Sequence, residues 1–238
     1  MIRRPAPSAA SALAALALAA GCSSADTTAN TGETTTNQSS DAPSTPAPEE
    51  PIDLSQIPDG TPLEPGTYAM GLVSDGGPAR AIVDVPDGYS AEFDGTVIGS
   101  DDGDIAFWGK VTQVDTDPCL GGERVDAGTS VRDLTSLLAA QRKMRTSQPV
   151  PVTIGGYHGD YLKLTAPADI ERCRGGSVTI YTAGDEWLQV DVPKATFHQW
   201  VLDVRGQRVV GGARIMPDAA NRDELIGMVE SAEFSVGQ

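Results

Sequence analysis

Residues 199–213 read QWVLDVRGQRVVGGA and give the clearest signal of the fold. Two runs rich in residues with high β propensity, Gln199–Val204 and Arg208–Ala213, are separated by only three residues. The tripeptide Arg205-Gly206-Gln207 between them is typical of a hairpin turn. The sequence therefore predicts two adjacent antiparallel strands in this stretch.

Strand patterns continue on both sides of this hairpin. They are predicted at Thr67–Val73, Arg80–Val85, Ile105–Val114, Val152–Ile154, Tyr157–Leu164, Val178–Tyr181, Trp187–Val192 and Glu233–Val236.

Two segments show helical signals instead. Ser130 is a predicted N-cap with Asp133 close to a capping-box position, and apolar residues follow at helical spacing. We expect the basic residues of 142–145 to occupy the last turn of this helix, where they suit its dipole. Asn221 with Glu224 begins a second helix. Runs of strands with two segregated helices predict an α+β domain, mainly an antiparallel sheet with two helices packed on it.

The N-terminus has the composition of an export signal. Arg3 and Arg4 precede an apolar run, Ala9–Ala20, and small residues follow it. The run is about 12 residues long, whereas a membrane-spanning helix needs roughly 20. We therefore interpret residues 1–21 as a signal peptide that is removed on export, and not as a transmembrane helix.

The end of this segment, Leu18–Cys22, resembles a bacterial lipobox, although Ala19 stands where that motif usually has Leu. The resemblance implies that Cys22 carries lipid and holds the exported protein at the outer face of the cell membrane. A lipobox cysteine bears at least two acyl chains, which is enough for durable anchoring. The alternative is an ordinary signal peptide that leaves Cys22 as a thiol.

Residues 22–55 are interpreted as a linker. Residues 23–50 contain no Leu, Ile, Val, Met or aromatic residue and are rich in Ser, Thr and Pro. Such a segment has no apolar surface to bury, which predicts disorder, and as a flexible coil it would span about 30 Å. We expect residues 56–238 to form a single domain large enough to bury a core.

The charge of the chain is strongly acidic, with 33 acidic and 17 basic residues and a formal net charge of −16. Removal of residues 1–21 takes away two basic residues and no acidic one, which leaves −18. An acidic surface is repelled by phosphate backbones and anionic headgroups, so the composition argues against nucleic-acid binding. Solubility is the simplest role for this charge.

Three cysteines are present. If Cys22 carries lipid, Cys119 and Cys173 remain as a pair in an oxidising compartment, which predicts a disulfide between them. The alternatives are a metal pair and a catalytic thiol. A zinc site needs further ligands at close spacing, and the two histidines, His158 and His198, lie far apart in the sequence. We expect no metal and no cofactor.

Catalytic motifs are not evident. The chain lacks a phosphate-binding loop and a nucleophile elbow. Asp101–Asp104 lacks the final Glu of a calcium-binding loop, and a turn between strands is the preferred interpretation. His158 is expected in an exposed loop, and His198 at the surface of a strand.

The tryptophans Trp108, Trp187 and Trp200 allow two interpretations. They could line a ligand groove, because aromatic side chains are common in binding pockets. With few aromatic residues in the chain, packing in the core is the preferred interpretation.

Several stretches together resemble a known group of actinobacterial lipoproteins. They are Val111–Val114 leading to Asp117–Cys119, Ser130–Leu138, Gly155–Tyr157 with Tyr161–Leu164, Trp200–Val204, and Glu224–Phe234. The ending is similar to LpqN-type lipoproteins and the wider Mog1/PsbP-like fold. The resemblance implies an α/β/α sandwich and a location in the cell envelope, and it carries no catalytic residues.

Two functional hypotheses follow. The first is a non-catalytic, surface-tethered module that binds an envelope protein, a glycan or a small apolar ligand. The second is an envelope hydrolase in which carboxylates distant in sequence act on a glycan. Two carboxylates facing each other in a deep cleft would favour the enzyme, and an apolar pocket or a flat exposed patch would favour binding.

Overall fold

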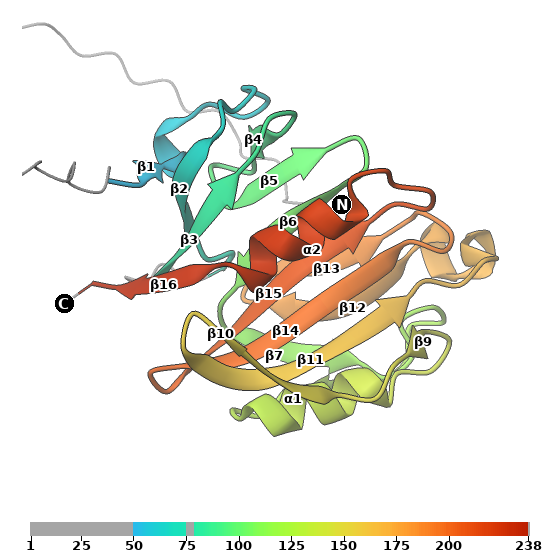
Figure 1. Cartoon of the computed structure of the whole chain (residues 1–238). Coiled ribbons are helices and arrows are strands. Elements are labelled where there is room, and N and C mark those ends of the chain that lie inside the picture. The colour runs from blue at the N-terminus through green and yellow to red at the C-terminus, as the bar shows by residue number, and fades with distance from the viewer. Residues whose placement is uncertain (1–49, 75–78, 238) are drawn as a thin grey trace, which may run out of the picture. The chain divides into compact units, whose positions relative to one another are not determined.

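The computed structural model describes residues 50–74 and 79–237 (Figure 1). The predicted signal peptide, the proposed lipid site at Cys22 and most of the predicted linker lie outside these residues.

A large central sheet is the main element of the fold (Figure 1). Its strands are β4 (Ser90–Glu92), β5 (Val97–Ser100), β6 (Gly103–Trp108), β9 (Arg145–Thr146), β10 (Val150–Ile154), β11 (Tyr157–Thr165), β14 (Thr196–Val204) and β15 (Gln207–Ile215). The order is β10-β11-β14-β15-β6-β5-β4, with β9 paired to β11, and all pairs are antiparallel.

Two smaller sheets accompany it. The second sheet has the order β13-β12-β7-β8, all antiparallel, with β7 (Val111–Asp115), β8 (Arg124–Asp126), β12 (Val178–Ala183) and β13 (Glu186–Val190). The third has the order β1-β2-β3-β16, with β1 (Ile52–Asp53), β2 (Gly66–Gly71), β3 (Ala79–Val85) and β16 (Glu233–Val236). Only the β1–β2 pair among these described strands is parallel.

The predicted hairpin is confirmed and lies in the middle of the central sheet. Strands β14 and β15 pair without interruption from Thr196–Ile215 to Val204–Gln207. Arg205 and Gly206 form the turn, both with positive φ, and the Gly206 N–H donates to the Asp203 carboxylate at 2.6 Å. The α+β class with a mainly antiparallel sheet is therefore correct.

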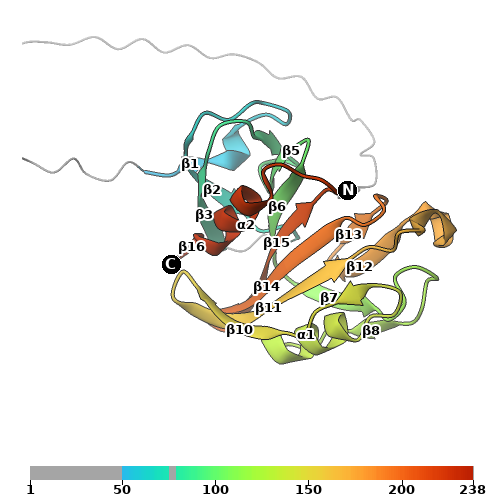
Figure 2. The ribbon, with the colours of Figure 1, turned by 45° about the vertical axis from the view of Figure 1, so that its right-hand side comes forward.

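Each face of the central sheet has its own hydrophobic core. One core lies between this sheet, the second sheet and helix α1 (Val131–Ala139). The other lies between the opposite face, the third sheet and helix α2 (Arg222–Glu230). Figure 2 shows the central strands between these two groups of elements. Residues that alternate along β14 therefore enter different cores.

Helix α1 begins as the sequence predicts. The Ser130 hydroxyl accepts from the Asp133 N–H, and the Asp133 carboxylate accepts from the Ser130 N–H, each at 3.1 Å, so the capping box is complete. These bonds hold the pKa of Asp133 below its ordinary value. The helix ends at Ala139, so the expectation that residues 142–145 form its last turn is wrong.

Helix α2 begins after Asn221, as expected, but the Asn221 side chain does not cap it. Its amide instead donates to the Tyr89 hydroxyl at 2.9 Å and the Ser100 hydroxyl at 3.1 Å, and the Tyr89 hydroxyl donates to the Glu224 carboxylate at 2.7 Å. These hydrogen bonds join the start of α2 to the residue before β4 and to the end of β5.

The single strand predicted at Ile105–Val114 is two strands in different sheets. Lys110 has a φ of 45°, which breaks the extended backbone between β6 and β7. Gly109 donates its N–H to the Val73 carbonyl at 3.0 Å, which fixes the break. The chain crosses here from the central sheet to the second sheet.

The domain also starts earlier than predicted. Strand β1 pairs with β2, and Leu54, in the 3₁₀ helix η1 (Leu54–Gln56), is completely buried. The boundary expected at residue 56 is therefore too late. A segment of two to four residues is too short to show a clear pattern of apolar and polar residues. Strands β1, β4, β5, β8 and β9 are all this short, and none of them was predicted from the sequence.

Candidate functional site

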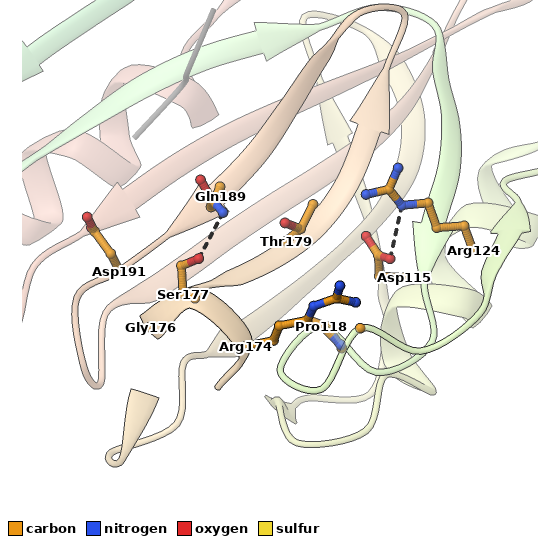
Figure 3. Close-up of a pocket in the computed structure, with 11 residues that line it drawn as sticks. Asp115, Pro118, Arg124, Arg174, Gly176, Ser177, Thr179, Gln189 and Asp191 are labelled. Atoms are coloured by element: carbon orange, nitrogen blue, oxygen red, sulfur yellow. Dashed lines mark hydrogen bonds and ion pairs between the residues drawn. The ribbon is translucent and has the colours of Figure 1, made fainter. Parts of the chain in front are cut away.

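A polar cavity of about 710 Å³ opens beside the second sheet (Figure 3). Strands β7, β8, β12 and β13 supply part of its wall, and the segments around Pro118 and Arg174 supply the rest. Its polar side chains are Asp115, Arg124, Arg174, Ser177, Thr179, Gln189 and Asp191. This lining mixes positive, negative and neutral hydrogen-bonding groups.

A disulfide joins the two segments of the chain, around Pro118 and Arg174, that line this cavity. Cys119 and Cys173 are bonded, with their Cα atoms 4.5 Å apart, which agrees with the predicted pairing. Next to it, the Arg174 N–H donates to the Cys119 carbonyl at 2.7 Å and the Thr179 N–H donates to the Pro118 carbonyl at 3.3 Å. The positions of Pro118 and Arg174 on the wall therefore depend on the disulfide.

The turn before the disulfide is built around Asp117. Its carboxylate accepts from the Leu120 N–H at 2.9 Å, and its carbonyl accepts from the N–H groups of Gly121 and Gly122. A Cβ at Gly122 would lie 2.7 Å from the Asp117 nitrogen, so only glycine fits there.

Asp115 and Arg124 form a partly buried ion pair on one side of the cavity. The Arg124 Nε donates to Asp115 Oδ1 at 3.2 Å, and 7% of the Asp115 side chain is exposed. Asp115 Oδ2 is buried and has no hydrogen-bond partner among the described residues. Burial raises the pKa of Asp115, and the Arg124 charge partly offsets this. A buried carboxylate oxygen without a partner is uncommon, and this one belongs to a residue of the cavity wall.

Arg174 supplies a positively charged hydrogen-bond donor to the lining of the cavity. No ion pair joins its guanidinium to an acidic side chain within the described part of the chain. Figure 3 shows this guanidinium within the cavity, between Asp115 and Ser177. The Ser177 hydroxyl accepts from the Gln189 amide at 2.8 Å, which orients both side chains. The cavity thus presents several donors and acceptors at once.

The three tryptophans do not form one groove. Trp108 and Trp200 are each 1% exposed and belong to different cores, on opposite faces of the central sheet. Trp108 packs edge-on against Tyr181. Trp187 is half-buried on β13, two residues from Gln189, and therefore on the same outer face of the second sheet as the cavity. Core packing is confirmed for two of the three.

The two histidines differ in environment. His158 is exposed, as predicted, but it lies in strand β11 and not in a loop, with Nδ1 2.9 Å from the hydroxyl of its β10 partner Thr153. The expectation for His198 is wrong, because it is 3% exposed, with Nδ1 2.8 Å from the Tyr161 hydroxyl. Burial, and then the charges of Arg222 and Lys163, lower the pKa of His198 to about 4, so it is neutral at neutral pH.

Metal ligands do not gather in the described residues, where no group of three or more His, Cys, Asp or Glu could hold an ion. Asp101 and Asp102 lie in the turn between β5 and β6, as predicted. No helix in the described part of the chain is long and apolar enough to cross a membrane.

The polar residues of the cavity were not identified from the sequence. They come from positions between 115 and 191 and meet only because β7, β8, β12 and β13 are neighbours. The available signal was the placement of Thr179 and Gln189, polar residues that alternate with buried ones on paired strands.

Comparison with known proteins gives no relative: the chain matches no family model, no curated protein and no solved structure.

Proposed function

We propose that this protein is an exported, lipid-anchored and non-catalytic binding module whose ligand is a glycan or a similar polyhydroxylated molecule. The observation that carries the proposal is the polar cavity itself, which is lined by the exposed carboxylate of Asp191 and by Arg174, whose guanidinium makes no ion pair within the described residues. Its volume of about 710 Å³ is within the range of small-molecule sites.

The mixture of groups favours a ligand rich in hydroxyls. A hydroxyl both donates and accepts a hydrogen bond, so it can pair with the Asp191 carboxylate and the Arg174 guanidinium alike. A strongly charged ligand would meet like charge on one side, because the wall holds two arginines and two aspartates. An apolar ligand would leave these groups unsatisfied.

Trp187 supports the same ligand class. Its half-buried ring lies on the outer face of β13 near Gln189, beside the cavity rather than in its wall. Large, amphipathic aromatic side chains offer a flat surface next to polar groups. A sugar ring that extends from the cavity would pack on it.

Binding is testable with a panel of neutral oligosaccharides of hexoses, pentoses and N-acetylated amino sugars, measured by calorimetry. For the sugar that binds, Arg174→Ala and Asp191→Asn should each weaken affinity about tenfold, the size of one lost charge-assisted hydrogen bond. Arg172→Ala is the matched control, because Arg172 is exposed nearby and pairs with Asp169 outside the cavity. Failure of the whole panel, or equal effects of Arg172→Ala and Arg174→Ala, would disprove the proposal.

A glycan hydrolase is the second candidate. The specific observation is that Asp115 is buried with a raised pKa and that Asp191 lies on the same cavity wall, since catalytic acids have raised pKa values. The ion pair with Arg124 opposes this role because it favours the ionised form. New reducing ends in the binding mixtures, lost in Asp115→Asn, would establish the hydrolase.

The lipid anchor at Cys22 is tested separately. Cells fed an alkyne analogue of palmitate should label the wild-type protein, and Cys22→Ala should abolish the label, because the thioether forms on that sulfur. Ala19→Leu, which restores the usual lipobox residue, should keep it. Label that persists in Cys22→Ala would refute anchoring at this position.

The resemblance to LpqN-type lipoproteins and the Mog1/PsbP-like fold remains part of the proposal. Its support is a helix on each face of an antiparallel sheet and a closing helix followed by a strand.

A further inference from the structure

A second cavity, of about 490 Å³, lies at the end of the central sheet where β9 pairs with β11. Four basic side chains and two threonines line it: Lys143, Arg145, Lys163, Lys194, Thr165 and Thr196. Its remaining lining residues carry no charge. We call this cavity the basic pocket. It shares no residue with the polar cavity.

Strand register brings these side chains together. Arg145 of β9 pairs with Thr165 of β11, and Thr165 pairs with Thr196 of β14. Lys163 lies two residues before Thr165 and therefore on the same face of the sheet. Lys194, just before β14, is held by a backbone bond from its N–H to the Pro167 carbonyl at 3.4 Å.

The described residues do not neutralise the positive charges in the basic pocket. None of the four basic side chains makes an ion pair with an acidic group of the described residues. The charge of Lys163 also acts on His198, its partner on β14, and helps to lower the pKa of the His198 imidazole. A chain with a net charge of −16 offers many carboxylates, yet none lines this pocket.

Two of the lysines also occupy unusual backbone positions. Lys143 and Lys194 have φ values of 68° and 63°, in the left-handed region where glycine is at ease and a residue with a Cβ is strained. Both are exposed, so packing does not require a long side chain there. Because Lys143 and Lys194 both line the basic pocket, their side chains supply positive charge to it.

We propose that the basic pocket binds a phosphate group. Several converging cations favour a ligand group with more than one negative charge, and lysine ammonium groups bind phosphate as point charges while arginine adds paired donors. Threonine hydroxyls add neutral donors. The pocket is larger than a single phosphate, so the group belongs to a larger molecule, either a soluble phosphate ester or the headgroup of an anionic lipid. The acidic composition predicted repulsion of such groups, and this pocket is a local exception.

The test uses calorimetry on the purified chain with three probes: inorganic phosphate, glycerol 3-phosphate and a short-chain, water-soluble phosphatidylglycerol. Saturable binding of at least one probe is expected, and affinity should fall as salt rises. Tighter binding of glycerol 3-phosphate identifies a soluble ester as the source, and tighter binding of the lipid identifies a headgroup.

The decisive variant is Lys143→Gln with Lys194→Gln, since both side chains are exposed and folding does not depend on them. It should weaken binding about tenfold or more. The control, Arg132→Gln with Arg205→Gln, removes the same charge from exposed positions outside the pocket and should leave affinity unchanged. Lys163→Gln provides a second test from the sheet itself.

Three results would overturn the proposal. They are the absence of binding of every probe, equal loss in the test and control variants, and binding of citrate as tight as that of the phosphate probes. None of them bears on sugar binding in the polar cavity, so the two proposals fail independently.

Discussion

Replacing Cys119 and Cys173 with serine should lower the free energy of unfolding by about 4 kcal/mol and abolish ligand binding in the polar cavity. The two cysteines are separated by 54 positions, so the bond restricts a long loop of the unfolded chain. It also holds together the segments of Pro118 and Arg174, which both line the cavity. Stability and binding should therefore fall together.

Denaturant unfolding of the double-serine variant and of the reduced wild type measures the first effect, and calorimetry with the identified sugar measures the second. Cys22→Ser is the control, because it removes a sulfur that takes no part in the Cys119–Cys173 disulfide. Intact mass before and after reduction should show one disulfide. Equal unfolding free energies for the oxidised and reduced protein would contradict this account.

Truncation of the buried tryptophans should have the second large effect. Trp108→Ala and Trp200→Ala should each cost about 3–5 kcal/mol of stability, because each leaves a large cavity in a packed core. Trp108 loses its contact with Tyr181, and Trp200 loses its contacts with Tyr161 and His198. The two losses arise in separate cores.

Trp187→Ala is the matched control, since its ring is only half-buried. It should cost about 1 kcal/mol or less but weaken sugar binding. Urea unfolding of the three variants separates these roles. A destabilisation by Trp187→Ala as large as that by Trp200→Ala would contradict the placement of Trp187 on the outer face.

Local signals in the sequence predicted much of the fold. The β14–β15 hairpin and the capping box of α1 depend on residues a few positions apart, so their patterns are visible without tertiary context. The α+β class followed from these elements. Strands β4 and β8 have only three residues each, and are defined by their partners rather than by their own composition.

The failures have tertiary causes. Ile105–Val114 reads as one apolar strand, and only the bond from Gly109 to Val73 reveals the crossing to another sheet. His198 was predicted at the surface of a strand, as one face of a strand is often exposed. Both faces of β14 are covered, however, so alternation cannot distinguish inside from outside there.

The candidate site was predicted only in part. The disulfide followed from cysteine counting, whereas Trp187 was named only as one of three tryptophans that could line a groove, with core packing preferred. Asp115, Arg174 and Gln189 carry no motif, because their spacing along the chain reflects strand order in the second sheet and not a local loop.

The pairing of β16 with β3 also limits when the third sheet can be completed during synthesis or export. Glu233–Val236 align with Ala79–Ile82, so nearly the whole domain separates the two strands in the chain. A chain that emerges N-terminus first, from a ribosome or a translocation channel, cannot complete the third sheet until Glu233–Val236 have emerged. Such distant pairing slows folding. Until then the edge of β3 is open to pairing with other chains, and truncation before Glu233 makes that vulnerability to aggregation permanent.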